Sequence, residues 1–199
     1  MLNLKKHHKK IIPQYFFKNK NEKIILQPTW SKLIRLKLSY ENKNISNNEE
    51  IRDIQAKKWG IENSDHALIE LFPLPSPNRS VWYYSKWTDL EYLKTREKYY
   101  EFVSGKRIEF IKNKIKEYKP KIVVLYSASN IKYWNKLVEK DIRKKAERME
   151  IEHSNNRKNI IRTLKEDSTC FIQTPHPIAR GISNEFWEKV GQKIREICG

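Results

Sequence analysis

Apolar residues along this chain follow two patterns, short unbroken runs and stripes with helical spacing. The unbroken runs are 66–72, 122–126 and 170–172, and each is flanked by proline or polar residues. Runs of this length with turn residues beside them are typical of buried strands. The helical stripes predict five helices, over 29–38, 47–60, 95–118, 130–140 and 183–197.

Several helix starts carry side chains suited to capping backbone N–H groups. The N-cap candidates are Thr29, Asn47 or Asn48, and Ser183 or Asn184. Gly60 suits the C-terminal end of the second helix, and Gly105 is a candidate break within the third. The segment 140–167 is highly charged and poorly patterned, which indicates a surface excursion.

The order of these elements alternates strand with helix from Thr29 onward. Such alternation favours a parallel sheet covered by helices on both faces. We therefore predict a three-layer α/β/α fold with a mostly parallel sheet of about four strands. Residues 1–26 are expected to form a basic tail or edge segment, and residues 27–199 a single domain.

Charge narrows the class of partner. The chain has 199 residues with 41 Lys and Arg against 24 Asp and Glu, a net charge of +17. This excess favours a polyanion such as nucleic acid, with codon bias or solubility as the alternative explanation. Two cysteines without paired spacing indicate neither a disulfide framework nor a cysteine zinc site. The charged start is not a secretory signal, and no apolar run could span a membrane, so we expect a cytoplasmic protein.

The richest local motif surrounds His176. This histidine stands between Pro175 and Pro177, directly after the apolar run 170–172, and Arg180-Gly181 follows. Proline fixes its own backbone and disfavours helix in the residue before it, so His176 is presented on a stiff turn. Open α/β sheets bind ligands at the carboxyl ends of their strands, which makes His176 a better functional candidate than an isolated histidine.

Three segments, taken in order, resemble the uracil-DNA glycosylase superfamily. They are 67–78, a predicted strand that leads into a proline-rich loop, 118–127, a helix end followed by a buried strand, and 175–181. The resemblance extends from about Thr29 to the C-terminus. One family feature, an early Gly-x-x-Pro motif that positions water, has no match upstream of Pro28.

The resemblance implies an enzyme that hydrolyses the N-glycosidic bond of a flipped base and leaves an abasic site. His176 would stabilise the departing base, and Glu70 stands where relatives place a polar residue that reads it. Asn78 and Trp82 would bind the base. DNA contacts would come from Ser76, Arg79, Arg180, Ser183 and Asn184. No metal or other cofactor is implied. The expected partner is double- or single-stranded DNA, without a membrane, and we expect a monomer.

Each assignment has a structural alternative. His176 would otherwise stiffen a turn, and Glu70 would pair with a neighbouring arginine. Trp82 and its aromatic neighbours would otherwise cover the core. Uracil is the default target of the family, whereas a carboxylate at Glu70 favours a modified cytosine, as in phage defence, because it accepts from the exocyclic amine. The competing functions are a non-catalytic DNA-binding protein on the same scaffold and a basic structural or ribosome-associated protein.

Overall fold

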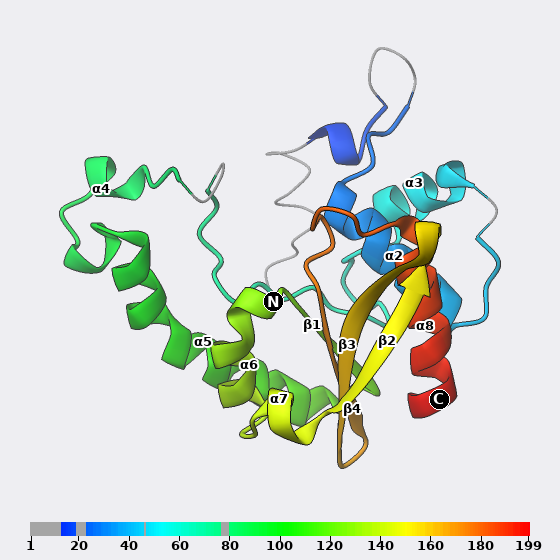
Figure 1. The fold of residues 1–199 in the computed structure, drawn as a ribbon. Coiled ribbons are helices and arrows are strands. Elements are labelled where there is room, and N and C mark those ends of the chain that lie inside the picture. Colours follow the sequence, from blue (N-terminus) through cyan, green and yellow to red (C-terminus); the bar gives the residue numbers. More distant parts are fainter. Residues whose placement is uncertain (1–12, 19–22, 46, 77–79) are drawn as a thin grey trace.

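A computed structural model describes residues 13–18, 23–45, 47–76 and 80–199 (Figure 1). The helices of the described part are α2 (Pro28–Tyr40), α3 (Asn48–Lys57), α4 (Tyr84–Trp87), α5 (Arg96–Tyr118), α6 (Ile131–Leu137), α7 (Ile142–Lys145) and α8 (Asn184–Cys198). The strands are β1 (Ile122–Tyr126), β2 (Glu147–His153), β3 (Arg157–Glu166) and β4 (Thr169–Thr174). Short 3₁₀ turns are η1 (Pro13–Tyr15), η2 (Glu91–Leu93), η3 (Ala128–Asn130) and η4 (Ser154–Asn156). The predicted α/β class is confirmed.

The four strands form one mixed sheet in the order β1-β4-β3-β2. Strands β1 and β4 are parallel, with Tyr126 opposite Thr174 at their carboxyl ends. The β4–β3 and β3–β2 pairs are antiparallel. The prediction of a mostly parallel sheet is therefore wrong, because the antiparallel half comes from the segment 140–167 that was expected to be a surface excursion.

Two differences explain the mixed sheet. On β2 the charged residues Arg148, Glu150 and Glu152 are exposed and alternate with the more buried Met149 and Ile151. This is the pattern of an antiparallel edge strand with one face exposed to solvent. The many charged residues make the alternation difficult to recognise in the sequence. The predicted strand at 66–72 forms no ladder and runs as an extended connection, because its apolar side chains pack onto the two cores without a backbone partner.

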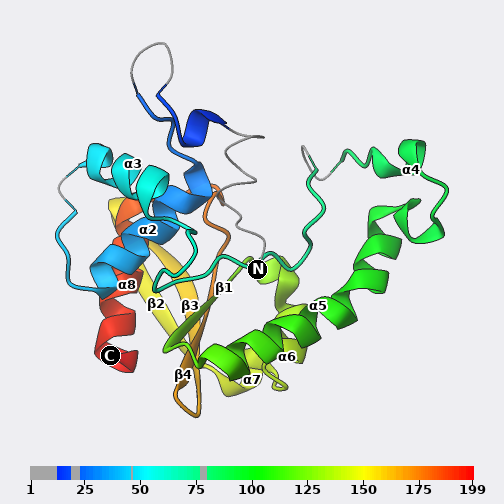
Figure 2. The same cartoon turned by 180° about the vertical axis from the view of Figure 1, so that it is seen from behind.

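Side chains alternate between two cores on opposite faces of the sheet. Ile122 and Val124 contact the core built with α2, α3 and α8, whereas Val123 and Leu125 contact the core built with α5, α6 and α7. Figures 1 and 2 show the corresponding helix groups on the two sides. This period of two is what a strand buried on both faces requires.

Two of the four capping predictions are confirmed, at Asn47 and Ser183, and Thr95 is a further cap that was not predicted; α3 ends at Lys57 with Lys58 as its C-cap, before Gly60. Asn47, Thr95 and Ser183 each accept a hydrogen bond from a backbone N–H in the first turn of α3, α5 and α8. Helix α2 starts earlier than predicted, with Gln27 as its cap in place of Thr29. Helix α5 continues through Gly105 for 23 residues, since an exposed glycine weakens a helix without preventing it.

A buried glutamine holds the segment before α2. Gln55 is completely buried, and its amide nitrogen donates to the carbonyl oxygens of Tyr15 and Ile25 at 2.8 and 2.9 Å. Its amide oxygen accepts from the N–H of Gln27 at 2.9 Å. One side chain thus satisfies three backbone groups, and it ties Tyr15, Ile25 and Gln27 to α3.

The part from α4 to the first half of α5 projects away from the sheet as an arm (Figures 1 and 2). The described part of the chain contains no helix that is long and apolar enough to cross a membrane. Cys170 on β4 and Cys198 at the end of α8 are joined by a disulfide, which corrects the expectation from their spacing. The fold brings together two cysteines that lie 28 residues apart.

Candidate functional site

The candidate site lies at the carboxyl ends of the parallel strands β1 and β4. Ser127, the first residue after β1, is buried and has a φ of 80°. Its carbonyl accepts from the indole N–H of Trp134 at 3.2 Å, which holds the turn in this unusual conformation. Strained turns of this kind are concentrated at functional sites. On the neighbouring strand, Pro175 and His176 follow Thr174.

His176 is held by its own loop and by Tyr126. The two rings meet edge to face, with 5.5 Å between their centres. The backbone N–H of Ile178 donates to Nδ1 of His176 at 3.3 Å, and the carbonyl of His176 accepts from Ala179 at 2.9 Å. Because Nδ1 is an acceptor here, the neutral ring carries its proton on Nε2. In this tautomer Nε2 is the ring nitrogen that can donate a hydrogen bond.

Glu70 lies near the same tyrosine. The residue is exposed overall, yet the protein atoms around its carboxyl group desolvate it and raise its pKa, against the lowering effect of Arg107. Burial also raises the pKa of Tyr126, and the charge of Glu70 raises it further. The guanidinium of Arg107 donates to the backbone carbonyl of Glu70 at 2.5 Å. The charge of Glu70 thus acts on Tyr126, whose ring also meets the ring of His176.

Sequence reasoning did not single out Tyr126 or Arg107. Tyr126 is the last residue of β1, so its position at the carboxyl end of a predicted strand was a usable signal. Arg107 lies inside α5, 37 residues from Glu70, and its contact with the 66–72 connection follows only from the fold. The alternative of a salt bridge at Glu70 is replaced by a backbone contact and a weaker charge interaction.

The predicted base-binding and loop residues have mixed positions. Asn78 and Arg79 lie outside the described residues. The indole N–H of Trp82 donates to the Leu93 carbonyl at 2.7 Å, and the Arg96 guanidinium lies 5.0 Å from the centre of its ring. Ser76 donates to the Val81 carbonyl and accepts from Arg96 at 2.9 Å. Trp82 and Ser76 therefore hold the segment before α4 against η2 and the start of α5.

The loop after His176 leads into α8. The hydroxyl of Ser183 caps Phe186 at 3.2 Å and lies 3.0 Å from Nδ1 of His153. Asn184 accepts from the Lys32 ammonium at 2.6 Å, and Arg180 is exposed. Ser183 is thus engaged in local structure, whereas Arg180 faces solvent beside it.

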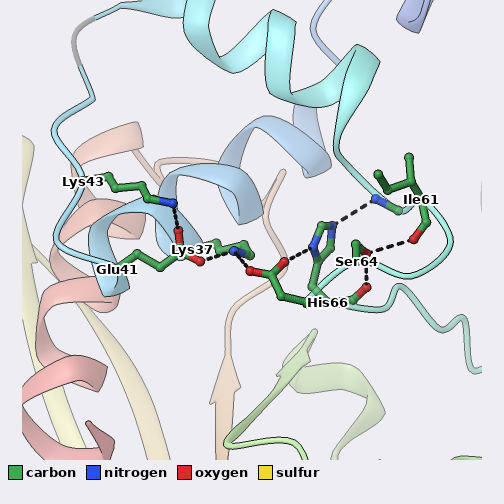
Figure 3. Close-up of polar contacts among 8 residues, drawn as sticks. Lys37, Glu41, Lys43, Ile61, Ser64 and His66 are labelled. Carbon is green, nitrogen blue, oxygen red and sulfur yellow. Dashed lines mark hydrogen bonds and ion pairs between the residues drawn. The ribbon is translucent and has the colours of Figure 1, made fainter.

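The two other histidines in the described part of the chain, His66 and His153, have structural partners. Nε2 of His66 accepts from the N–H of Gly60 at 3.0 Å, its Nδ1 lies 3.0 Å from Asp65, and its ring stacks on Trp59. Figure 3 shows this group continuing through Lys37 to Glu41 on α2. Hydrogen bonds from Lys37 and His66 lower the pKa of Asp65 to about 2.

His153 is buried between the sheet and α8. Its Nε2 lies 2.6 Å from the side-chain oxygen of Asn159, and its other nitrogen faces Ser183. The ring packs edge to face on Phe186. Both ring nitrogens are thus paired, and no group of three or more side chains able to hold a metal ion occurs in the described part of the chain.

Comparison of the chain with family models, curated proteins and solved structures gives no match.

Proposed function

We propose that this protein is a DNA glycosylase that hydrolyses the N-glycosidic bond of a damaged or modified base. The observation that supports the proposal is that Tyr126, at the end of β1 beside β4, contacts the ring of His176 and lies within reach of the charge of Glu70. A desolvated carboxyl group and an oriented imidazole are what bond cleavage between a sugar and a base requires. The protein would act on a base extruded from DNA.

The two groups have separate roles in this mechanism. Negative charge develops on the base as the bond breaks, and the Nε2 proton of His176 would stabilise it by a hydrogen bond. Positive charge develops on the sugar at the same time, and the carboxylate of Glu70 would accept a proton from the attacking water. Burial raises the pKa of Glu70, so its ionised form is a stronger proton acceptor than an ordinary carboxylate.

Tyr126 would position His176. Its ring meets the imidazole edge to face, and proline on either side of His176 limits the alternatives open to the loop. A fixed imidazole stabilises the transition state without reorganising as charge develops. The substitution Tyr126→Phe keeps the ring contact and removes the hydroxyl, so it separates packing from any polar role of this side chain.

The test is single-turnover excision on duplexes that carry uracil, 5-hydroxymethylcytosine or a glucosylated cytosine. We expect His176→Ala to slow excision by about 10²–10³-fold while DNA binding remains, because the interaction strengthens in the transition state. Glu70→Gln should slow excision by at least about 10²-fold. Glu109→Gln, at an exposed position on α5, is the matched control. Excision by His176→Ala at the wild-type rate would exclude this role.

A non-catalytic DNA-binding protein is the second candidate. The observations that favour it are the absence of a Gly-x-x-Pro motif upstream of Pro28 and the antiparallel half of the sheet. Wild-type protein that binds all three duplexes and releases no base would support this candidate over the enzyme.

A further inference from the structure

A group of cations surrounds the loop that joins His176 to α8. The guanidinium of Arg157, at the start of β3, comes so close to Gly181 that a Cβ added there would lie 3.2 Å from its Nη1. Arg180 is the neighbouring residue in the loop. Lys32 reaches the same loop from α2, where its ammonium contacts Asn184 at 2.6 Å and the Ile182 carbonyl at 3.4 Å. Three elements far apart in the sequence thus bring positive charge to one turn.

Two carboxylates on the first half of α8 have partners outside this group of cations. Glu185 pairs with Lys189 at 2.7 Å and accepts from Ser154, and Glu188 pairs with Arg35 at 2.6 Å. Within the described residues, neither Arg157 nor Arg180 forms a salt bridge. Burial and the charge of Arg35 lower the pKa of Lys32, against the opposing effect of Glu188. Arg157 and Arg180 thus have no carboxylate paired with them in the described part of the chain, and Glu188 acts on Lys32 only through its charge.

The backbone leaves room for the group. Gly181 has a φ of +83°, a conformation that other residues rarely adopt. A side chain at this position would meet the Arg157 guanidinium. Glycine therefore permits the turn and leaves the space that this guanidinium occupies. Arginine binds phosphate with two parallel hydrogen bonds, which suits it to this position.

We propose that Arg157, Arg180 and Lys32 form a binding site for a backbone phosphate of DNA beside the His176 loop. The inference rests on the proposed function for the identity of the polymer, and it adds Arg157 and Lys32, which sequence reasoning did not select. A phosphate held here would fix the strand next to the candidate site. Phosphate contacts of this kind position a nucleic acid without reading its sequence.

The experiment measures binding of a short labelled DNA duplex by fluorescence anisotropy over a series of salt concentrations. Arg157→Gln should weaken binding by about tenfold, and it should reduce the slope of log affinity against log salt by about 0.9. Arg143→Gln is the matched control, because Arg143 is exposed on α7, at the opposite end of the sheet (Figure 1). Equal losses in the two variants would overturn the site in favour of diffuse attraction.

A second variant leaves the charge unchanged. Gly181→Ala should weaken binding because its Cβ displaces Arg157, whereas Gly105→Ala, which has nothing within 4 Å of the added atom, should not. Wild-type affinity in Gly181→Ala together with wild-type affinity in Arg157→Gln would refute the proposal. Thermal unfolding followed by circular dichroism checks that each variant is folded.

Two further arms separate the sources of phosphate and the two proposals. Millimolar inorganic phosphate at constant ionic strength should fail to displace the duplex, and displacement would assign the site to a free phosphate instead. DNA binding does not require excision of a base. Wild-type affinity in Arg157→Gln would therefore contradict the phosphate site without contradicting the proposed glycosylase. If the wild-type protein releases no base while Arg157→Gln still weakens binding, only the proposed glycosylase is contradicted.

Discussion

Gly191 provides the sharpest test of how the helices pack. It lies in α8 where that helix crosses α2, and a Cβ at this position would lie 2.3 Å from the carbonyl oxygen of Leu36. The same atom would lie 2.8 Å from Cβ of Ser39 and 2.9 Å from the backbone nitrogen of Tyr40. Two of these three atoms belong to the backbone, so no rotation of a side chain can relieve the clash. Gly191→Ala must therefore separate the two helices.

The size of the effect follows from this geometry. Restoring ordinary contact requires a separation of about 1 Å, and a gap of that size forfeits up to about half of the dispersion attraction between the atoms it parts. Inserting an extra group into a packed core usually costs about 1–3 kcal/mol, and a backbone clash lies at or above the upper end. Alanine returns about 1 kcal/mol through its helix propensity. We expect a net loss of about 2–4 kcal/mol in the free energy of unfolding.

Urea denaturation followed by circular dichroism measures this loss. The matched control is Gly105→Ala in α5, where an added Cβ meets nothing within 4 Å. That substitution should stabilise the protein by about 0.5–1 kcal/mol, because alanine restricts the unfolded chain and favours helix. Equal unfolding free energies for the two variants would show that α2 and α8 do not approach as closely as described.

Three further predictions concern buried and titrating groups. Gln55→Leu should lower the free energy of unfolding by about 2–4 kcal/mol, since three partly buried backbone groups lose their partners, whereas Gln192→Leu on the exposed face of α8 should stay within about 0.5 kcal/mol of wild type. Asp65→Asn should lose less than about 1 kcal/mol at neutral pH because its ion pair is largely exposed. The pKa of Asp65 is lowered in the folded state, so wild type should lose this advantage as pH falls through about 2. The pKa of Glu70 is raised in the folded state, so its ionised form destabilises the fold, which is the opposite of the effect at Asp65. Glu70→Gln should therefore be more stable than wild type at neutral pH, and the difference in denaturation midpoint should shrink as pH falls through the pKa of Glu70.

The antiparallel half of the sheet shows where sequence reasoning failed. Alternation of Met149 and Ile151 with charged residues was present in the segment 140–167, yet the density of charge concealed it. The apolar run 66–72 is the reverse case, because it predicted a strand where the structure has an extended connection. Its apolar side chains serve packing: Leu68 contacts the core on the α2 and α8 side of the sheet, and Leu71 belongs to the core on the α5 and α6 side. Burial alone does not make a strand, since a strand also needs a partner for its backbone.

The sequence by itself determined the elements whose signals are local. The strand Ile122–Tyr126 and the starts of α3, α5 and α8 depend on apolar runs and capping side chains a few residues apart, so they could be predicted. Only the tertiary structure placed Glu70 near Tyr126, Arg157 beside Gly181, and α8 against α2 at Gly191. These contacts join residues 24 or more positions apart, and they depend on strand order and helix approach, which no local pattern encodes.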